Sequence, residues 1–300
     1  MNKPKVIAIV GPTASGKTSL SISLAKTFNG EVVSSDSRQV YKGLDLGTGK
    51  VTHAEMSGVP HHLLDIKNAT DVYTASDFKT DAEKSLRDIT ARGKLPIVAG
   101  GTFFYLDVLM GKMSTPSVAP DPELRSILET KTTHELYEAL LAKDPIRAES
   151  IDRENPRRLI RALEIVEAVG TVPKVTKSES PYQWLTLGID ISMDILRERI
   201  YQRIIERIEA GMIDEVVALH SHGLTYKRME DLGLEYRYIS RYLQGLLSKD
   251  EMITQLNFKI GQFAKRQRMW LKRDKSIVWL PFPVDIEKTH FYVENFLREN

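Results

Sequence analysis

The 300-residue sequence contains no cysteine. Disulfide bonds and zinc sites with thiolate ligands are therefore excluded, and nothing in the chain calls for an oxidising compartment. Long apolar runs are missing too, since no stretch approaches the roughly 18 residues of a membrane-spanning helix. The first residues lead straight into a strand-like run, without an apolar signal region or cleavage site. These absences predict a cytoplasmic protein that does not enter a membrane.

A large excess of charge of either sign is also absent, because the net charge is only +2. The charge is unevenly placed, however, since residues 257–275 hold seven Lys or Arg against one acid, Asp274. Such a cluster on a nearly neutral protein favours an anionic partner, although a solvated helix face has a similar pattern.

Strand-like and helical patterns alternate along the chain. Residues 5–10 form an apolar, β-branched run, and residues 17–28 place apolar side chains at helical spacing. Further strands are predicted at 31–36, 61–66, 95–102, 185–191 and 277–280, and helices at 74–92 and 193–222. This alternation predicts an α/β fold, a P-loop NTPase-like doubly wound parallel sheet.

A loop rich in Pro and Ser at 114–122 interrupts the alternation, and the pattern from 123 to 169 is helical throughout. We therefore predict a catalytic core formed by 1–114 and 181–300. The intervening residues 115–180 form a helical insertion domain.

A phosphate-binding pattern follows the first strand. The segment Gly11-Pro12-Thr13-Ala14-Ser15-Gly16-Lys17-Thr18 fits G-x-x-x-x-G-K-[ST] at every position. The glycines let backbone N–H groups point at an anion, and the next helix adds the partial positive charge of its N-terminus. Lys17 is suited to neutralise phosphate oxygens, and the Thr18 hydroxyl to bind Mg²⁺. The preceding strand and following helix are the context that such a diphosphate site requires.

The loop leaves its ligand open among ATP, GTP and other diphosphates. The guanine signature N-K-x-D is absent, which disfavours a GTPase. The strand at 95–99 continues into Gly100-Gly101-Thr102, with no acid where a Walker B aspartate would hold Mg²⁺. A pyrophosphate cradle without that acid indicates a diphosphate that serves as a leaving group.

Six blocks spread over nearly the whole chain resemble the tRNA dimethylallyltransferase family, also called tRNA isopentenyltransferases. They are GPTASGKT at 11–18, SDSRQVYKGLDLGT at 35–48, PHHLLD at 60–65, GGT at 100–102, RLIRALE at 158–164 and AKRQ at 264–267. The first block is generic, but the order and spacing of all six are specific. The resemblance implies transfer of a dimethylallyl group from dimethylallyl diphosphate to N6 of adenine 37, in tRNAs reading codons that begin with U, with release of diphosphate.

The resemblance also implies roles for the diphosphate-binding residues. The loop at 11–18 would hold the diphosphate of the allylic donor. Lys17, the loop amides and Mg²⁺ on Thr18 would stabilise the charge that grows as the C–O bond breaks. Arg199 and Arg203, one helical turn apart, would reach the same phosphates, with a solvated helix face as the alternative.

On the acceptor side, Asp36 would contact the adenine N6 and act as general base, and Thr102 would lie near the target nucleotide. Capping of a turn or helix is the alternative for both. Because adenine 37 must leave its stack, contacts from two sides are expected. The residues expected to contact tRNA are Asp36, Ser37, Arg38, Gln39, Thr102, Arg125, Arg157, Arg158, Leu159, Ile160, Arg161, Lys265 and Arg266. Phe263 and Trp270 form either a stacking surface or, as is commoner for aromatics, part of the core.

The chain departs from the family pattern at several positions. Ile260 and Gly261 replace a threonine and an arginine, Leu234 replaces a tyrosine, and Arg207 replaces a methionine. These changes bear on the fine tRNA contacts and leave the chemistry of the loop at 11–18 intact.

Three other functions compete with this interpretation. They are a P-loop kinase of a small molecule, a non-catalytic nucleotide-gated RNA-binding module, and a prenyltransferase of free AMP or ADP. The basic cluster and the Arg-rich insertion favour the anticodon stem-loop of tRNA as the partner. Mg²⁺ is the expected cofactor, and no obligate protein partner is inferred.

Overall fold

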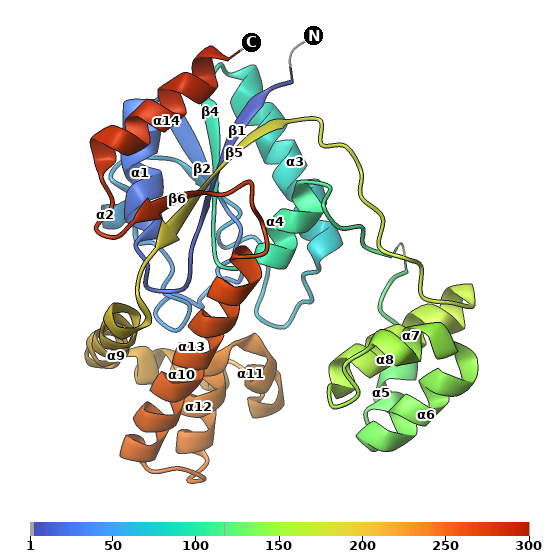
Figure 1. Ribbon diagram of the computed structural model, residues 1–300. Helices are drawn as coiled ribbons and strands as arrows, with labels where there is room; N and C mark the ends of the chain where they lie inside the picture. Colours follow the sequence, from blue (N-terminus) through green and yellow to red (C-terminus); the bar gives the residue numbers. More distant parts are fainter. Residues whose placement is uncertain (1–2, 117, 300) are drawn as a thin grey trace. The chain divides into compact units, whose positions relative to one another are not determined.

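A six-stranded parallel sheet forms the centre of the larger part of the chain (Figure 1). The computed structural model describes residues 3–116 and 118–299. The strands lie in the order β3 (His61–His62), β2 (Gly30–Ser34), β4 (Leu95–Ala99), β1 (Lys5–Val10), β5 (Gln183–Asp190) and β6 (Val278–Pro281). Every neighbouring pair is parallel. The predicted α/β class with a parallel sheet is confirmed.

Helices cover both faces of this sheet. Ile7 and Ile9 of β1 pack in one apolar cluster with Leu24 and Val293. Phe78, on the inner face of the helix predicted at 74–92, is fully buried. Figure 1 shows α1 and α14 on one side of the strands and α3 and α4 on the other. The helices that flank the sheet are α1 (Lys17–Thr27), α2 (His53–Met56), α3 (Ala75–Ala91), α4 (Phe103–Leu109) and α14 (Ile286–Arg298). Burial on both faces explains why the strands are almost continuously apolar.

The strands predicted at 31–36 and 95–102 end at Ser34 and Ala99, and two other elements depart further from the sequence pattern. The single helix predicted at 193–222 is two helices, because Gly211 adopts a left-handed φ of 99° between α9 and α10. The strand predicted at 61–66 ends at His62, because Leu63 and Asp65 have positive φ angles that turn the chain. The helices beyond β5 are α9 (Met193–Glu209), α10 (Met212–Ser221), α11 (Tyr226–Leu232), α12 (Leu234–Leu243) and α13 (Lys249–Leu271). Within the described residues, none of the helices is long and apolar enough to cross a membrane.

The chain separates into two compact units. The larger unit comprises Met1–Met110 and Glu179–Asn300, and the helical unit comprises Gly111–Ser178. The sequence placed these boundaries after residues 114 and 180. The helical unit consists of α5 (Pro122–Leu128), α6 (Thr133–Lys143), α7 (Pro145–Ser150) and α8 (Pro156–Val169). Its own core includes Leu136, Leu140 and Leu163, all fully or almost fully buried.

Candidate active site

Three loops meet at the carboxyl edge of the sheet. They are residues 11–16 after β1, 35–39 after β2 and 100–102 after β4, and these three strands are neighbours. Parallel strands end at the same edge, which is where open α/β sheets place their ligands. The sheet therefore brings Lys17, Asp36 and Thr102 to one region from distant parts of the sequence.

The loop at 11–18 is closely packed at its first glycine. A Cβ on Gly11 would lie 2.7 Å from the Ser15 hydroxyl oxygen, so a larger residue there would have to displace the Ser15 side chain. Gly16 adopts a left-handed φ of 97° as it begins α1. The Lys17 ammonium donates to the carbonyl oxygens of Gly11 at 2.9 Å and Pro12 at 2.8 Å. The Lys17 side chain is thus folded back over the loop, while Thr18 is exposed in the first turn of α1.

Positive charge is concentrated around this loop. The pKa of the Lys17 ammonium is lowered to about 8, mainly by burial and then by the nearby charge of Arg203. The negative charge of Asp36 acts in the opposite direction. Burial also lowers the pKa of Arg203 to about 10, and the neighbouring Arg207 adds to the effect. Cations that are desolvated and repel one another are stabilised by an anion placed among them. The electrostatics therefore suit a polyanionic ligand.

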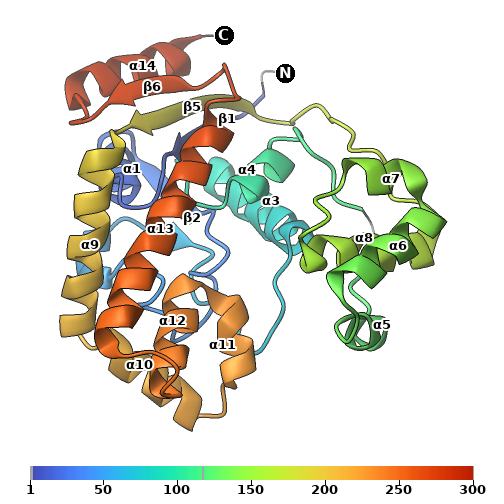
Figure 2. The same ribbon diagram turned by 60° about the horizontal axis from the view of Figure 1, so that its bottom comes forward.

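The predicted pair Arg199 and Arg203 faces this loop from α9. The Arg199 Nε–H donates to the carbonyl of Ala14 at 2.7 Å, and its guanidinium lies 5.4 Å from the Phe282 ring centre. Both arginines are half-buried, whereas Arg197 on the same helix is exposed. Figure 2 shows α9 and α13 alongside each other below the sheet, and the two helices pack together. A solvated helix face does not describe Arg199 or Arg203.

Asp36 lies two residues beyond β2 and is half-buried. Its Oδ1 accepts from the backbone N–H of Arg38 at 2.9 Å and of Gln39 at 3.4 Å. One carboxylate oxygen therefore caps the turn, as the alternative interpretation predicted. The other oxygen, Oδ2, lies on the side of Gly101, 3.7 Å from where a Cβ of that glycine would be. The two oxygens thus have separate environments, and capping leaves Oδ2 available for chemistry.

Thr102 precedes α4 but does not cap it with its side chain. Its hydroxyl oxygen instead accepts from the Ser37 N–H at 3.0 Å, and its own N–H donates to the Ser35 carbonyl at 3.1 Å. Gly100 is required here, because a Cβ would lie 2.3 Å from the Ser35 carbonyl oxygen. The helix-capping alternative for Thr102 is wrong, since its side chain joins the 100–102 loop to the segment that carries Asp36.

Arg38 and Gln39, the two residues after Ser37, lie beside Asp36 and are surrounded by other parts of the larger unit. The Gln39 side-chain amide donates to the Gly49 carbonyl at 3.2 Å. Burial lowers the pKa of Arg38, which lies near Tyr41 and Asp36. Both side chains are half-buried, so they line the region beside Asp36.

Three further residues join this region without having been predicted. Gln267 of α13 is only 4% exposed and bonds to both the 11–18 and the 100–102 loops. Arg207 lies against Gly49 and pairs with Glu235, with 3.8 Å between Nη1 and Oε1. Burial raises the pKa of Glu235, and the charges of Arg207 and Arg203 act in the opposite direction. Gln267 is the last residue of a block that carries the family resemblance, and Arg207 is a departure from the family pattern. The sequence therefore drew attention to both residues without indicating a role for either.

In the helical unit, the predicted tRNA contacts fall into three groups. Arg157 and Arg158 are exposed. Arg125 and Arg161 both pair with the fully buried carboxylate of Glu164, at 2.8 Å and 3.1 Å. Leu159 and Ile160 are buried in the core of the helical unit. The prediction that these two side chains contact tRNA is therefore wrong, because the apolar face of α8 points inward.

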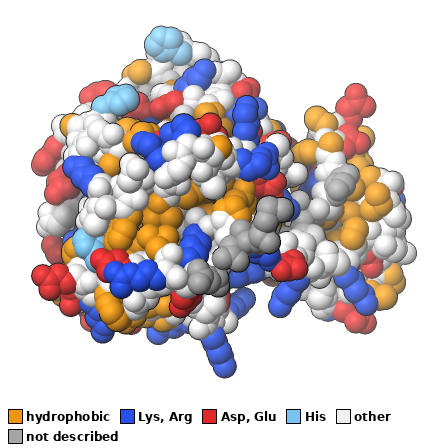
Figure 3. Space-filling view, turned by 90° about the horizontal axis from the view of Figure 1, so that it is seen from above, with side chains coloured by type: hydrophobic (Ala, Val, Ile, Leu, Met, Phe, Trp, Pro, Cys, Tyr) orange, Lys and Arg blue, Asp and Glu red, His pale blue; other side chains and the backbone are white. Residues whose placement is uncertain are grey.

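The exposed face of α13 combines cations with aromatic rings. Lys265 and Arg266 are exposed, and the Arg266 guanidinium lies 6.0 Å from the Phe263 ring centre. Phe263 is 39% and Trp270 36% exposed, so the core alternative for both is wrong. The Trp270 Nε1–H donates to Asp107 Oδ2 at 3.0 Å. Seen from the end where the termini lie, by contrast, the larger unit mixes basic, acidic and hydrophobic side chains (Figure 3).

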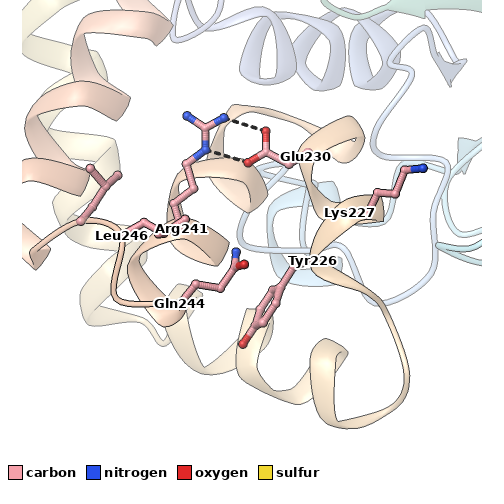
Figure 4. Close-up of a pocket in the computed structure, with 7 residues that line it drawn as sticks. Tyr226, Lys227, Glu230, Arg241, Gln244 and Leu246 are labelled. Atoms are coloured by element: carbon pink, nitrogen blue, oxygen red, sulfur yellow. Dashed lines mark hydrogen bonds and ion pairs between the residues drawn. The ribbon is translucent and has the colours of Figure 1, made fainter. Parts of the chain in front are cut away.

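A separate pocket of about 620 Å³ lies between α11, α12 and the following turn (Figure 4). Tyr226, Lys227, Gln244 and Leu246 are among its lining residues, none of which belongs to the three loops at the sheet edge. The Arg241 guanidinium in this pocket pairs with both carboxylate oxygens of Glu230, at 2.7 Å and 2.9 Å. Arg237 shares that carboxylate, with 3.0 Å between its Nε and Glu230 Oε2. The pocket is therefore separate from the candidate site at the loops.

The parallel sheet and the glycine-bounded loop before α1 define a P-loop-like α/β protein. A family model described as IPP transferase matches residues 39–274. The tRNA dimethylallyltransferase of Thermomicrobium roseum is 41% identical over 310 residues, covering 100% of this chain and 94% of the relative. The tRNA dimethylallyltransferase 2 of Treponema denticola is 44% identical, covering 91% and 93% of the two chains. The chain belongs to the IPP transferase family.

Solved structures agree with this assignment. The tRNA isopentenylpyrophosphate transferase of Bacillus halodurans is 36% identical with a TM-score of 0.73, covering 98% of this chain and 96% of the other. A eukaryotic dimethylallyltransferase, solved while acting on tRNA, is 30% identical with a TM-score of 0.75 and covers 93% and 74%. Both similarities extend over nearly the whole of this chain.

Proposed function

We propose that this protein is a tRNA dimethylallyltransferase, which transfers a dimethylallyl group from dimethylallyl diphosphate to N6 of adenine 37 in tRNAs reading codons that begin with U. The observation that carries the proposal is the convergence of Lys17 and Arg203 with the carboxylate of Asp36 at the sheet edge. Such a site can bind a diphosphate and accept a proton at a neighbouring carboxylate. Relatives named as tRNA dimethylallyltransferases, similar over the whole chain, support the choice of reaction.

The diphosphate of the donor binds on the 11–18 loop, with Lys17, Arg199 and Arg203 around it. When the C–O bond breaks, the bonding electron pair leaves with the diphosphate. Lys17 and the loop amides stabilise that charge. The negative charge of the bound donor favours the protonated form of Lys17, so the ammonium is charged during the reaction. The loop thus serves a leaving group and no phosphoryl group is transferred.

Mg²⁺ fits this site as a substrate-borne ion. Thr18 offers one hydroxyl oxygen, and residues 3–116 and 118–299 contain no cluster of three His, Asp or Glu arranged to bind a metal. Mg²⁺ takes most of its ligands from phosphates and water in such sites. Bound there, the ion would neutralise further charge on the leaving diphosphate.

Asp36 acts on the other reactant. As the new C–N bond forms, the N6 proton of the adenine passes to the carboxylate, and Oδ2 is the oxygen free of the turn that Oδ1 caps. A positioned base of this kind contributes about 10²- to 10⁴-fold in rate. Thr102 and Ser37 hold the segment on which Asp36 lies.

The tRNA is held by cations on exposed surfaces. Arg157 and Arg158 on the helical unit and Lys265 and Arg266 on α13 are suited to phosphate contacts. Phe263 beside Arg266 offers a face on which an unstacked base can rest. Together with Mg²⁺, these residues supply the groups that the proposed reaction uses, which favours an enzyme that acts without an obligate protein partner. We place its activity in the cytoplasm.

Nucleoside mass spectrometry tests the proposal. The purified protein is incubated with Mg²⁺ and unmodified tRNA, with either dimethylallyl diphosphate or ATP, and AMP replaces tRNA in a third reaction. We expect N6-dimethylallyladenosine in tRNA from the first reaction alone. ATP turnover without a prenylated nucleoside would identify a kinase, and prenylated AMP with unmodified tRNA would identify a mononucleotide prenyltransferase.

A further inference from the structure

Gln267 joins two loops that belong to opposite sides of the proposed reaction. Its Oε1 accepts from the Thr13 backbone N–H at 2.8 Å, and its Nε2 donates to the Gly101 carbonyl at 2.9 Å. The side chain is 4% exposed and comes from α13, far from both loops in sequence. A buried side-chain amide with both ends bonded to backbone groups holds those groups at a fixed separation.

The two partners also fix which way the amide points. The Thr13 N–H can only donate and the Gly101 carbonyl can only accept, so the oxygen must face Thr13 and the nitrogen Gly101. The reversed amide would place like groups together at both ends. Gln267 therefore fits this position through its chemistry, and a side chain of equal size without the amide would not replace it.

The contacts continue from Gly101 to the proposed base. A Cβ on Gly101 would lie 3.1 Å from Gln267 Nε2 on one side and 3.7 Å from Asp36 Oδ2 on the other. The next residue, Thr102, bonds to the backbone of Ser35 and Ser37. A connected path thus runs from the diphosphate loop through Gln267 to the segment that carries Asp36.

We propose that Gln267 is a positioning residue that sets the distance between the donor diphosphate on the 11–18 loop and the acceptor site at Asp36. The inference rests on the proposed function, because it assigns the two loops to the two reactants. Attack of N6 on the allylic carbon requires the reactants to be placed within about an ångström, and a misplacement of that size costs about 10²-fold in rate. Gln267 touches neither reactant and acts through the two loops.

The first test is Gln267→Met, which keeps the length of the side chain and removes both hydrogen bonds. We expect kcat for tRNA prenylation to fall about ten- to a hundredfold. The affinity for tRNA should change much less, because Lys265 and Arg266, although adjacent in sequence, keep their exposed positions on α13 while residue 267 is buried. Gln255→Met on the exposed face of α13 is the matched control and should keep the wild-type kcat. A variant that lowers the melting temperature but keeps the kcat of its folded fraction would show a purely structural role and overturn the proposal.

A second variant, Gln267→Glu, gives a signature that loss of stability cannot imitate. The ionised carboxyl still accepts from the Thr13 N–H but repels the Gly101 carbonyl, whereas the protonated carboxyl can donate to it. The ratio of variant to wild-type kcat should therefore rise as the pH is lowered. A ratio that does not change with pH would contradict a donor role for the Gln267 amide.

Hydrogen exchange separates this inference from the proposed function. In the wild type, Mg²⁺ and pyrophosphate should slow amide exchange in both 11–18 and 100–102, whereas in Gln267→Met protection should be confined to 11–18. Equal protection of 100–102 in both proteins would overturn the coupling. If the wild type binds pyrophosphate with this coupled protection but prenylates no tRNA, the proposed function fails and the linkage through Gln267 stands.

Discussion

Arg199 donates its Nε–H to the carbonyl oxygen of Ala14, a residue 185 positions away, at a distance of 2.7 Å. The bond holds a guanidinium against the 11–18 loop before any ligand arrives. A cation that is already in place loses little side-chain entropy when it binds an anion.

Replacing Arg199 should weaken donor binding. A hydrogen bond to a charged group contributes about 1.5–3 kcal/mol, so Arg199→Ala should lower kcat/KM for dimethylallyl diphosphate by about ten- to a hundredfold. Steady-state kinetics with saturating tRNA measures this. Arg197→Ala, an exposed arginine of the same helix, should behave like the wild type. Equal effects from both variants would show that only the net charge of α9 matters.

Donor affinity should depend on pH through Lys17, whose pKa is lowered to about 8. Below that pH the side chain is an ammonium and attracts the diphosphate, and above it the neutral amine does not. Titration calorimetry without tRNA should therefore show affinity for dimethylallyl diphosphate falling as the pH rises through about 8. Lys17→Arg remains charged and should lose this pH dependence. An affinity that is flat between about pH 7 and 9 in the wild type would place the titrating group elsewhere.

Asp36→Asn should separate binding from chemistry. The amide oxygen of asparagine can still cap the turn at Arg38, so the fold and tRNA affinity should be kept. The side chain can no longer take the N6 proton, and single-turnover transfer should fall about 10²- to 10⁴-fold. Transfer at the wild-type rate would exclude Asp36 as the base.

The cations on the exposed face of α13 should govern how tRNA binding responds to salt. Each phosphate that a cation neutralises adds about 0.7–0.9 to the slope of log affinity against log salt. The double change Lys265→Ala with Arg266→Ala should therefore flatten that slope by up to about two such contributions. Lys26→Ala with Lys84→Ala changes the net charge equally at exposed positions on α1 and α3. A similar slope for both double variants would argue against a phosphate contact on α13.

Local signals in the sequence predict the phosphate-binding loop of the candidate site. Gly11, Lys17 and the surrounding apolar pattern define a strand, a loop and a helix within one short stretch. The adjacency of Asp36 and Thr102 then follows, because β2 and β4 are neighbouring parallel strands. The break at Gly211 was missed because apolar spacing continues across it, and only the left-handed backbone reveals the turn.

Contacts that depend on packing were not visible in the sequence. Gln267 reaches Thr13 across 254 positions, and no local pattern reports such a distance. Leu159 and Ile160 stand between arginines in a block that carries the family resemblance, and the resemblance implied tRNA contacts for the whole block. Helical geometry turns both side chains into the core of the helical unit, whereas Arg158 of the same block is exposed.

The insertion of the helical unit has a consequence for synthesis of the chain. β1 lies between β4 and β5 in the sheet, but β5 begins only at Gln183, beyond the whole helical unit. While the ribosome makes the intervening residues, one edge of β1 has no partner, although β4 is already available. Open strand edges recruit other chains and promote aggregation. Truncated products that stop before β5 should therefore be poorly soluble, and the nascent chain should depend on protection until its central strand is enclosed.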